Sequence, residues 1–334
     1  MTSSNGLRLA FYGAGEVARD HAEAARALGA VISAGSTRSE DSERWCLFHR
    51  QFPEAKFEKE PKNFASRNDI DGIVVALPWD KQDDALEWAL GCPKLILIEK
   101  PIASNSSLLR RLLEKHPSTQ ANKLVGYNRR YYSTVDALRQ RLSSGGLRAA
   151  CITISEDVAR LHRRRGPEIL SEYLVNSSCH VLDAAISLFG PLKALHITRT
   201  RQDFEGGSFD SFNGLLSTAS GIPVCFNCNA YDPAPVGIDC RFDDGTRWCL
   251  SPMERLRIFE GYDVIERSDN CQIRRYEPHL ADEIIEDASL RPGFLPQMRA
   301  FLTNDFGPGC RPADALHLLD LTEQIKATAK EPAQ

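Results

Sequence analysis

Five apolar runs separated by segments of helical pattern fill the first 125 residues, and this arrangement constrains the fold more than any other feature of the chain. Each run is apolar at almost every position, which is typical of strands buried on both faces. Parallel strands joined by helices have this property, because the helices cover both faces of the sheet. The pattern predicts an α/β fold with a doubly wound parallel sheet. The runs are 7–12, 31–35, 72–77, 95–98 and 123–127.

The pattern changes after residue 125, where strands predominate over helices. We therefore expect two domains, 1–125 and 126–334, the second built on an antiparallel sheet of about six strands. Asp243-Asp244-Gly245 predicts a hairpin turn within it. The expected strands are 149–155, 194–200, 211–217, 223–230, 237–242, 248–251 and 255–259. The expected helices are 131–142, 177–188, 292–302 and 313–327, and a C-terminal helix is expected to pack back on the first domain.

The balance of charges and the cysteine content limit the classes of function. The formal net charge is −4, from 41 Lys and Arg against 45 Asp and Glu, which argues against a general nucleic-acid-binding protein. No apolar stretch approaches the ~20 residues of a membrane-spanning helix, and residues 1–6 lack the pattern of a signal peptide. We therefore expect a cytoplasmic protein with no membrane partner and ten reduced cysteines. The single CxxC pair, Cys225 and Cys228, would point to opposite faces of a strand, so no metal site is expected.

A glycine-rich motif, Gly13-x-Gly15-x-x-Ala18, follows the first apolar run and opens the first helix. In this context such a motif binds a dinucleotide, since the glycines allow a tight turn and a close approach of the pyrophosphate to the helix N-terminus. The alternative is a glycine turn without a ligand. We expect the cofactor to contact Gly13, Ala14, Gly15, Glu16 and Val17.

The end of the second apolar run indicates which nicotinamide dinucleotide binds. NAD-specific sites usually have an acidic residue here, whereas this chain has Ser36, Thr37 and Arg38. Two hydroxyl groups and a guanidinium suit the 2′-phosphate of NADP(H), so we expect NADP(H) to be favoured over NAD(H). The competing interpretation is a solvated Arg38 and an NAD(H) site, with which the nearby Asp41 is compatible.

Glu99-Lys100-Pro101 closes the buried run 95–98. Ligands in an open α/β sheet bind at the carboxyl ends of the strands, so Lys100 is expected where a nicotinamide ring would lie. A lysine at that point is a cationic proton donor. The alternative interpretation is a surface lysine that ends a strand.

Several short motifs together resemble those of the Gfo/Idh/MocA oxidoreductase family, which includes glucose-fructose oxidoreductase and inositol dehydrogenase. The matching elements are 13–18, 76–78, 99–101, 126–130 and 176–183. The resemblance covers nearly the whole chain. It implies an N-terminal Rossmann domain and a C-terminal α/β domain with an open, mostly antiparallel sheet for substrate binding and oligomerisation. It also implies a homo-oligomer, either a dimer or a tetramer.

The resemblance implies roles for individual residues as well. Lys100 would reach toward the reacting oxygen and the nicotinamide ribose, and His180 would share the proton transfer with it. The family usually has aspartate in place of Asn176, whose amide can hydrogen-bond a substrate hydroxyl but cannot take a proton. Further cofactor contacts are expected from Leu77, Pro78, Gln82, Glu99 and Lys100, and further substrate contacts from Tyr127, Asn128 and Arg129.

A basic cluster, residues 161–166, precedes His180 and is expected to form a loop. One interpretation is a clamp in which Arg163 and Arg164 hold the diphosphate of a nucleotide sugar. The other is a solvated segment, which is the usual state of surface arginines.

These expectations converge on an NAD(P)-dependent dehydrogenase or reductase. It would transfer a hydride between nicotinamide and a secondary alcohol or ketone of a sugar or nucleotide sugar, in the biosynthesis of a carbohydrate or surface polysaccharide. Two alternatives are a reductase of a non-sugar imine or ketone, and a non-catalytic regulator that keeps the fold and the cofactor pocket.

Overall fold

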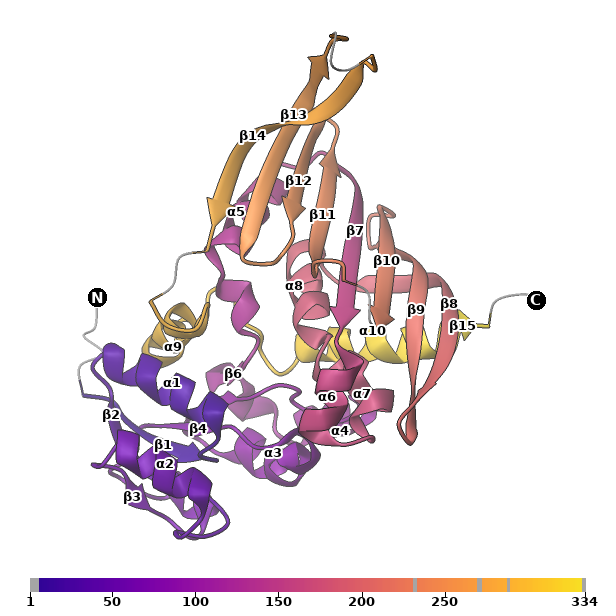
Figure 1. Cartoon of the computed structure of the whole chain (residues 1–334). Coiled ribbons are helices and arrows are strands. Elements are labelled where there is room, and N and C mark those ends of the chain that lie inside the picture. Colours follow the sequence, from indigo (N-terminus) through magenta and orange to yellow (C-terminus); the bar gives the residue numbers. More distant parts are fainter. Residues whose placement is uncertain (1–5, 231–232, 269–271, 287–288, 332–334) are drawn as a thin grey trace. The chain divides into compact units, whose positions relative to one another are not determined.

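Figure 1 shows the computed structural model of the chain, which describes residues 6–230, 233–268, 272–286 and 289–331. The chain divides into two compact units. The first unit contains the described residues of 1–131 and 287–320, and the second contains those of 132–286 and 321–334. The first unit therefore continues past the expected boundary at residue 125, and it includes a segment that was expected in the second domain.

A six-stranded parallel sheet forms the centre of the first unit, which confirms the predicted α/β fold. Its strand order is β3-β2-β1-β4-β5-β6, so the order reverses between β1 and β4, where ligands bind in sheets of this kind. The strands are β1 (Arg8–Tyr12), β2 (Val31–Ser36), β3 (Lys56–Phe57), β4 (Gly72–Val75), β5 (Leu95–Ile98) and β6 (Lys123–Val125). The helices that follow them are α1 (Glu16–Ala27), α2 (Glu43–Gln51), α3 (Gln82–Gly91) and α4 (Ser106–Lys115), and the short 3-10 helices are η1 (Pro61–Ala65), η2 (Trp79–Lys81), η3 (Pro117–Asn122) and η4 (Asn128–Tyr131).

Small side chains on α1 allow a helix from the later segment to complete the core of the first unit. Ala18 and Ala22, four residues apart on one face of α1, are fully buried. The helix α9 (Phe294–Thr303) packs against α1 and places Phe294 and Phe301 in the same core. Residues 287–320 therefore belong to the first unit, because they supply part of its core.

Side chains that follow β6 hold the returning segment in place. The Tyr131 hydroxyl donates a hydrogen bond to the carbonyl oxygen of Phe306 at 2.8 Å. The buried Arg130 donates from Nη1 to the carbonyl oxygen of Pro308 at 3.3 Å. Burial raises the pKa of Tyr131 above its ordinary value, so its hydroxyl stays protonated and remains a donor.

Nine strands form the sheet of the second unit, where about six were expected. Their order is β14-β13-β12-β11-β7-β10-β9-β8-β15, and all neighbours are antiparallel except β7 with β10 and β8 with β15. The strands are β7 (Leu147–Glu156), β8 (Leu192–Phe204), β9 (Gly207–Thr218), β10 (Pro223–Ala230), β11 (Gly237–Phe242), β12 (Thr246–Leu250), β13 (Arg255–Ile265), β14 (Arg275–Ile285) and β15 (Ala329–Lys330). The helices are α5 (Ser133–Ser143), α6 (Val158–Arg165), α7 (Ile169–Asn176) and α8 (Cys179–Phe189), and α10 (Ala315–Thr328) begins in the first unit and ends in the second.

Alternation along the central strand β7 shows that one face of this sheet is buried. Ala150 and Ile152 are buried, whereas Cys151 between them is only half-buried. The helix α8 contacts β7 and β11, and α5 contacts β12 and β13. The same alternation in β10 leaves Cys225 exposed and Cys228 buried, which confirms that the CxxC pair points to opposite faces. In the described part of the chain, none of the helices is both long and apolar enough to cross a membrane.

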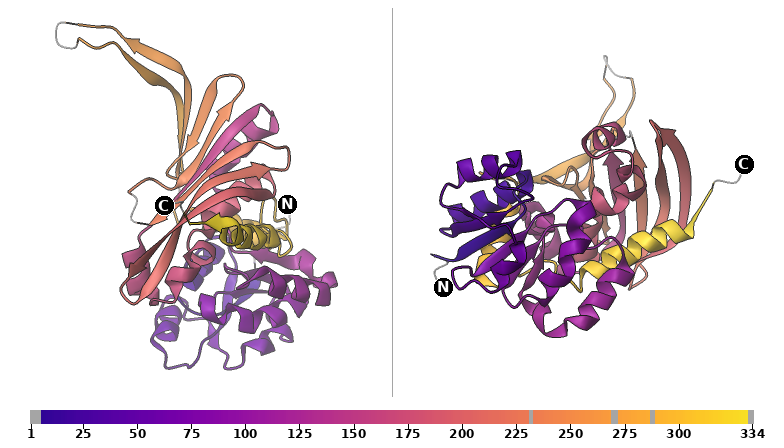
Figure 2. Two further views of the ribbon diagram at one scale, coloured as in Figure 1. Left: turned by 90° about the vertical axis from the view of Figure 1, so that its right-hand side faces the viewer. Right: turned by 90° about the horizontal axis from the view of Figure 1, so that it is seen from below.

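The strands β13 and β14 extend beyond the rest of the sheet as a two-stranded ribbon (Figures 1 and 2). Its register places Val264 opposite Tyr276, so these side chains share one face with Tyr262, and their exposed fractions are 44%, 60% and 69% respectively. The other face carries Asp263 and His279, whose carboxylate oxygen and Nδ1 lie 3.1 Å apart. The ribbon therefore has an exposed apolar face and a charged face.

Candidate active site

The glycine motif forms a tight turn at the point where the strand order of the first sheet reverses, and its backbone passes close to that of Ala76. Gly13 has a φ of +104°, and its amide donates to the carbonyl oxygen of Ser36 at 2.9 Å. A Cβ at Gly13 would lie 2.2 Å from the carbonyl oxygen of Ala76, so only glycine fits. Gly15 precedes the first turn of α1 with a φ of −72°, and a Cβ there would meet no atom within 4 Å. Gly13 is thus required by the fold, whereas Gly15 leaves open space beside the helix N-terminus.

The end of β2 presents one exposed cation and one buried hydroxyl. Arg38 is exposed, as a residue that binds a cofactor phosphate must be. Ser36 is buried, and its Oγ has no hydrogen-bond partner among the described residues. The Thr37 hydroxyl donates to the carbonyl oxygen of Ser39 at 2.8 Å and lies 2.9 Å from the Ser42 hydroxyl, so it shapes the turn itself.

The Glu99 carboxylate fixes the backbone at the end of β5. Its Oε2 accepts a hydrogen bond from the backbone amide of Lys100 at 3.1 Å, and its Oε1 lies 2.7 Å from Nε2 of His21. The Gln82 amide donates to the carbonyl oxygen of Glu99 at 3.0 Å. Gly126 gives this carboxylate room, because a Cβ there would lie 2.6 Å from Oε1. Glu99 and Gln82 therefore position the half-buried Lys100, which is followed by a cis peptide bond to a proline.

Sequence reasoning missed His21, which completes this arrangement. Its side chain on α1 is fully buried, and its ring lies against Phe294 with the centroids 4.6 Å apart. The pair of His21 and Glu99 joins residues 78 positions apart in the sequence. The only local signal was a titratable side chain on the otherwise alanine-rich buried face of a helix.

Two of the three residues expected to bind substrate after β6 are buried, and one of them holds the fold together. Tyr127 and Asn128 are both buried. The Asn128 side-chain amide donates to the carbonyl oxygen of Pro292 at 2.8 Å, which ties the returning segment to the sheet. Arg129 is half-buried, and it is the most accessible of the three residues expected to bind substrate here.

In the second unit, Asn176 and His180 lie on either side of the junction between α7 and α8. Asn176 is the last residue of α7 and is buried, and its Nδ2 donates to the carbonyl oxygen of Glu172 at 3.1 Å. His180 lies in the first turn of α8 and is half-buried. The junction is fixed by Glu156 at the end of β7, whose carboxylate accepts hydrogen bonds from the hydroxyls of Ser177 and Ser178 at 3.0 and 2.7 Å.

The basic cluster at 161–166 does not form the expected loop. Residues 158–165 form the helix α6, because Asp157 caps its N-terminus through a 2.9 Å bond from the Arg160 amide. Gly166, with a φ of +84°, ends it. Arg163 and Arg164 are both exposed on this helix. Among the residues with described positions, no group of three or more His, Cys, Asp or Glu could hold a metal ion.

Comparison with known proteins identifies the first unit. Residues 7–127 match the Gfo/Idh/MocA model, described as an oxidoreductase family with an NAD-binding Rossmann fold. The resemblance to this family that was expected from the motifs is confirmed for residues 7–127. The expected fold class is confirmed as well.

One curated protein matches a longer stretch of sequence than the family model does. An inositol 2-dehydrogenase of Rhizobium meliloti (strain 1021) is 29% identical over 164 residues, which make up 46% of this chain and 48% of that dehydrogenase. The match therefore spans about half the length of this curated relative.

Two solved structures share the fold over nearly the whole chain. One is a 3-ketoreductase from Actinomadura kijaniata in complex with NADP and TDP-benzene, with 16% identity, a TM-score of 0.71, and coverage of 98% of this chain and 99% of that chain. The other is UDP-N-acetylglucosamine 3-dehydrogenase from Acidithiobacillus ferrooxidans, with 16% identity, a TM-score of 0.72, and coverage of 97% and 98%. At such identities the likeness concerns the fold alone.

Proposed function

We propose that this protein is an NAD(P)-dependent oxidoreductase that interconverts a secondary alcohol and a ketone on a sugar or nucleotide sugar. The observation that carries the proposal is the position of Lys100. It follows β5 at the carboxyl edge of a sheet whose sequence matches an NAD-binding oxidoreductase family, and Glu99 and Gln82 hold its backbone.

The cofactor site rests on the glycine turn. Open space at Gly15 and the amides at the start of α1 suit a pyrophosphate, and the exposed Arg38 suits a 2′-phosphate. The hydroxyl of Ser36, which has no hydrogen-bond partner in the part of the chain that the structure describes, is a further group for the adenosine ribose region. NADP(H) is therefore proposed over NAD(H). When bound, the nicotinamide supplies or accepts the hydride.

The proton is proposed to move through Lys100 and His180. Nζ of Lys100 and the imidazole of His180 would give a proton to the forming alkoxide during reduction and take it back during oxidation, and a positive charge on either group stabilises that alkoxide. Asn176 would position the substrate through a hydrogen bond to a hydroxyl, since an amide cannot exchange a proton.

The substrate class is proposed from relatives and from exposed arginines. The solved relatives include a 3-ketoreductase with bound TDP-benzene and a UDP-N-acetylglucosamine 3-dehydrogenase, and both descriptions support a nucleotide sugar. Arg129, Arg163 and Arg164 would contact its diphosphate, and biosynthesis of a carbohydrate or surface polysaccharide is the proposed setting.

A cytoplasmic homo-oligomer is proposed, either a dimer or a tetramer formed through the second sheet. The described cysteines are free thiols, which suits a reducing compartment. The exposed apolar face of the ribbon formed by β13 and β14 supports contact between copies of the chain.

The test is turnover of a panel of nucleotide sugars and inositols by the full chain with NADPH or NADH, in the wild type and in Lys100→Met. Loss of a positioned acid or base costs about 100-fold or more, so Lys100→Met should lose at least that much activity and still bind the cofactor. Lys115→Met is the matched control, because this lysine is exposed and forms an ion pair with Glu87 on the surface.

Three results would contradict the proposal. Wild-type turnover by Lys100→Met would remove the proton-transfer role. Turnover of imines or non-sugar ketones alone would favour the alternative reductase. Cofactor binding without turnover of any compound would favour the non-catalytic regulator.

A further inference from the structure

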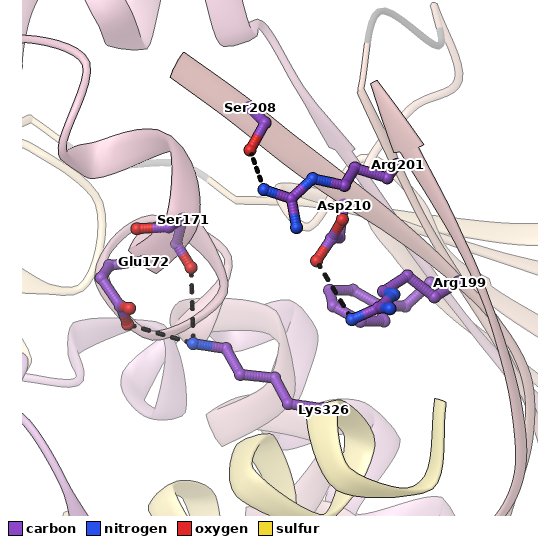
Figure 3. A pocket seen from close by; sticks show the side chains of 8 residues that line it. Ser171, Glu172, Arg199, Arg201, Ser208, Asp210 and Lys326 are labelled. Carbon is purple, nitrogen blue, oxygen red and sulfur yellow. Dashed lines mark hydrogen bonds and ion pairs between the residues drawn. The ribbon is translucent and has the colours of Figure 1, made fainter. Parts of the chain in front are cut away.

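A charged pocket lies within the second unit, bounded by β8 and β9 on one side and by α7 and α10 on the other (Figure 3). It has a volume of about 230 Å³, and Phe212 forms an apolar part of its wall. It contains none of the residues assigned above to the cofactor, to proton transfer or to the substrate. The pocket therefore calls for an explanation of its own.

Positive charge exceeds negative charge among the residues that line the pocket. The cations are Arg199, Arg201 and Lys326, and the carboxylates are Glu172 and Asp210. Lys326 is compensated, since its Nζ lies 3.1 Å from Oε2 of Glu172. The ion pair between Arg199 and Asp210 is long, at 3.9 Å.

Arg201 is the cation that the pocket does not compensate. Its Nη2 donates to the Ser208 hydroxyl at 2.6 Å, and it has no ion pair in the described part of the chain. Arg199 also meets Glu331 at 3.3 Å, but that carboxylate is 72% exposed, so solvent screens most of its charge. The two guanidinium groups project from β8 at alternate positions and thus from one face of the strand (Figure 3).

The pocket also contains an unused donor and an unused acceptor. Nε of Arg199 and Oδ1 of Asp210 are both buried, and neither has a hydrogen-bond partner among the described residues. Buried polar atoms are rarely left without a partner, because an atom that has lost its water and gained no hydrogen bond destabilises the fold. A ligand that satisfied both would present an acceptor to the arginine and a donor to the carboxylate.

We propose that this pocket binds a small hydroxylated oxyanion, such as a sugar acid or a sugar phosphate. Arg199 and Arg201 hold the oxyanion, because a guanidinium matches carboxylate and phosphate oxygens. Asp210 accepts a hydrogen bond from a hydroxyl of the same molecule. The carboxylates of the pocket disfavour an anion that has no hydroxyl to donate. The site depends on contacts within the second unit alone, so it stands whether or not the proposed oxidoreductase activity is found.

The test is isothermal titration calorimetry on the full chain without cofactor at low ionic strength. Gluconate and glucose 6-phosphate are the two probes, with sulfate, an oxyanion that has no hydroxyl at neutral pH, and neutral glucose as comparisons. Both probes should bind with millimolar or lower dissociation constants and more tightly than sulfate, and glucose should give no heat. Glucose binding as tightly as gluconate would overturn the oxyanion site, and sulfate binding most tightly would overturn the role of Asp210.

Variants decide whether the heat comes from this pocket. Arg201→Ala should weaken binding of both probes at least tenfold. Arg274→Ala should leave binding unchanged, because this exposed arginine pairs with Glu266 at 3.0 Å on the ribbon. Unchanged binding by Arg201→Ala would overturn the proposal. Arg201→Gln keeps part of the side chain and a polar end without the charge, and it serves if the alanine variant fails to fold, with the same weakening expected.

Discussion

The same added methyl group should destabilise the fold at Gly13 and leave stability almost unchanged at Gly15, although cofactor binding should fall in both variants. Gly13→Ala places a Cβ 2.2 Å from the carbonyl oxygen of Ala76, whereas ordinary contact begins near 3.4 Å, so the two backbones must separate by more than 1 Å. Neither backbone segment can move freely, because each is held by a hydrogen bond. The amide of Ala76 is bonded to the carbonyl oxygen of Tyr12 at 2.8 Å, and that of Gly13 to Ser36 at 2.9 Å.

The expected cost of Gly13→Ala combines two effects. Holding a residue with a side chain at positive φ costs about 1–2 kcal/mol, and overpacking typically costs about 1–3 kcal/mol more. The free energy of unfolding should therefore fall by roughly 2–5 kcal/mol. For a unit of this size, this corresponds to a Tm lower by roughly 4–20 °C. Cofactor binding should fall as well, because the turn itself is distorted.

Gly15→Ala is the matched control, in which we expect weaker cofactor binding without a loss of stability. Its φ of −72° suits alanine, and the added Cβ meets no protein atom. Loss of glycine at a helix N-cap costs a few tenths to about 1 kcal/mol, and the reduced freedom of the unfolded chain offsets about as much. The Tm should stay within about 2 °C of the wild type. NADPH affinity should fall at least tenfold, because the methyl group occupies the approach of the pyrophosphate.

The assay is thermal unfolding followed by intrinsic fluorescence, with NADPH titration of each variant at a temperature where it is folded. A wild-type Tm for Gly13→Ala would refute the packing argument. Wild-type NADPH affinity for Gly15→Ala would refute the placement of the phosphates.

Two further predictions concern the cofactor and the pH dependence of stability. Arg38→Ala should raise the Kd for NADPH by about 10–100-fold, which is the effect of losing a charge-assisted hydrogen bond. The Kd for NADH should stay within about twofold of the wild-type value. Equal weakening of NADPH and NADH binding in a fluorescence titration would contradict the 2′-phosphate contact. Burial lowers the pKa of Lys123 from 10.5 to about 8. Between these pH values the amine is neutral in the folded state and protonated in the unfolded state. The free energy of unfolding therefore rises with pH in this range. Relative to Lys123→Met, the wild type should gain up to about 3 kcal/mol between pH 7.5 and 10.5, measured by urea unfolding; a difference independent of pH would contradict this.

The local pattern of the sequence was sufficient to predict much of the fold. The strands β1, β4 and β5 are short, continuously apolar and bounded by turns, so their burial on both faces was readable from the sequence. The Gly245 turn was equally clear, and it joins β11 and β12 as an antiparallel pair with a φ of +83°.

The predictions of other elements were wrong because the local sequence pattern does not contain what stabilises these elements. The strand predicted at 255–259 continues to 265, and β14 was not predicted at all. The ribbon that they form is exposed, so its sequence lacks the alternation that burial imposes. The helix α6 was mistaken for a loop because four of its last five residues are basic or histidine, although Asp157 and Gly166 marked its two ends.

The candidate site divides in the same way. The glycine turn and the position of Lys100 followed from motifs, whereas the contact of His21 with Glu99 depends on tertiary structure that brings α1 to the end of β5. The anchoring of Asn128 to Pro292 likewise joins distant segments. Motifs therefore supplied the candidate residues, and the structure shows which side chains hold Lys100 and Asn128 in place.

The interrupted first unit has a consequence for how the protein is made. The alanine face of α1 leaves the ribosome early, but Phe294 and Phe301, which cover it, are synthesised about 270 residues later. At roughly 5–20 residues per second, the nascent chain would carry this apolar face uncovered for about 15–55 s while the strands of the second unit emerge. A fragment that ended at residue 127 would keep the nucleotide turn and lack Phe294 and Phe301. The segment matched by the family model is thus a unit of sequence, and completion of its core awaits the synthesis of α9.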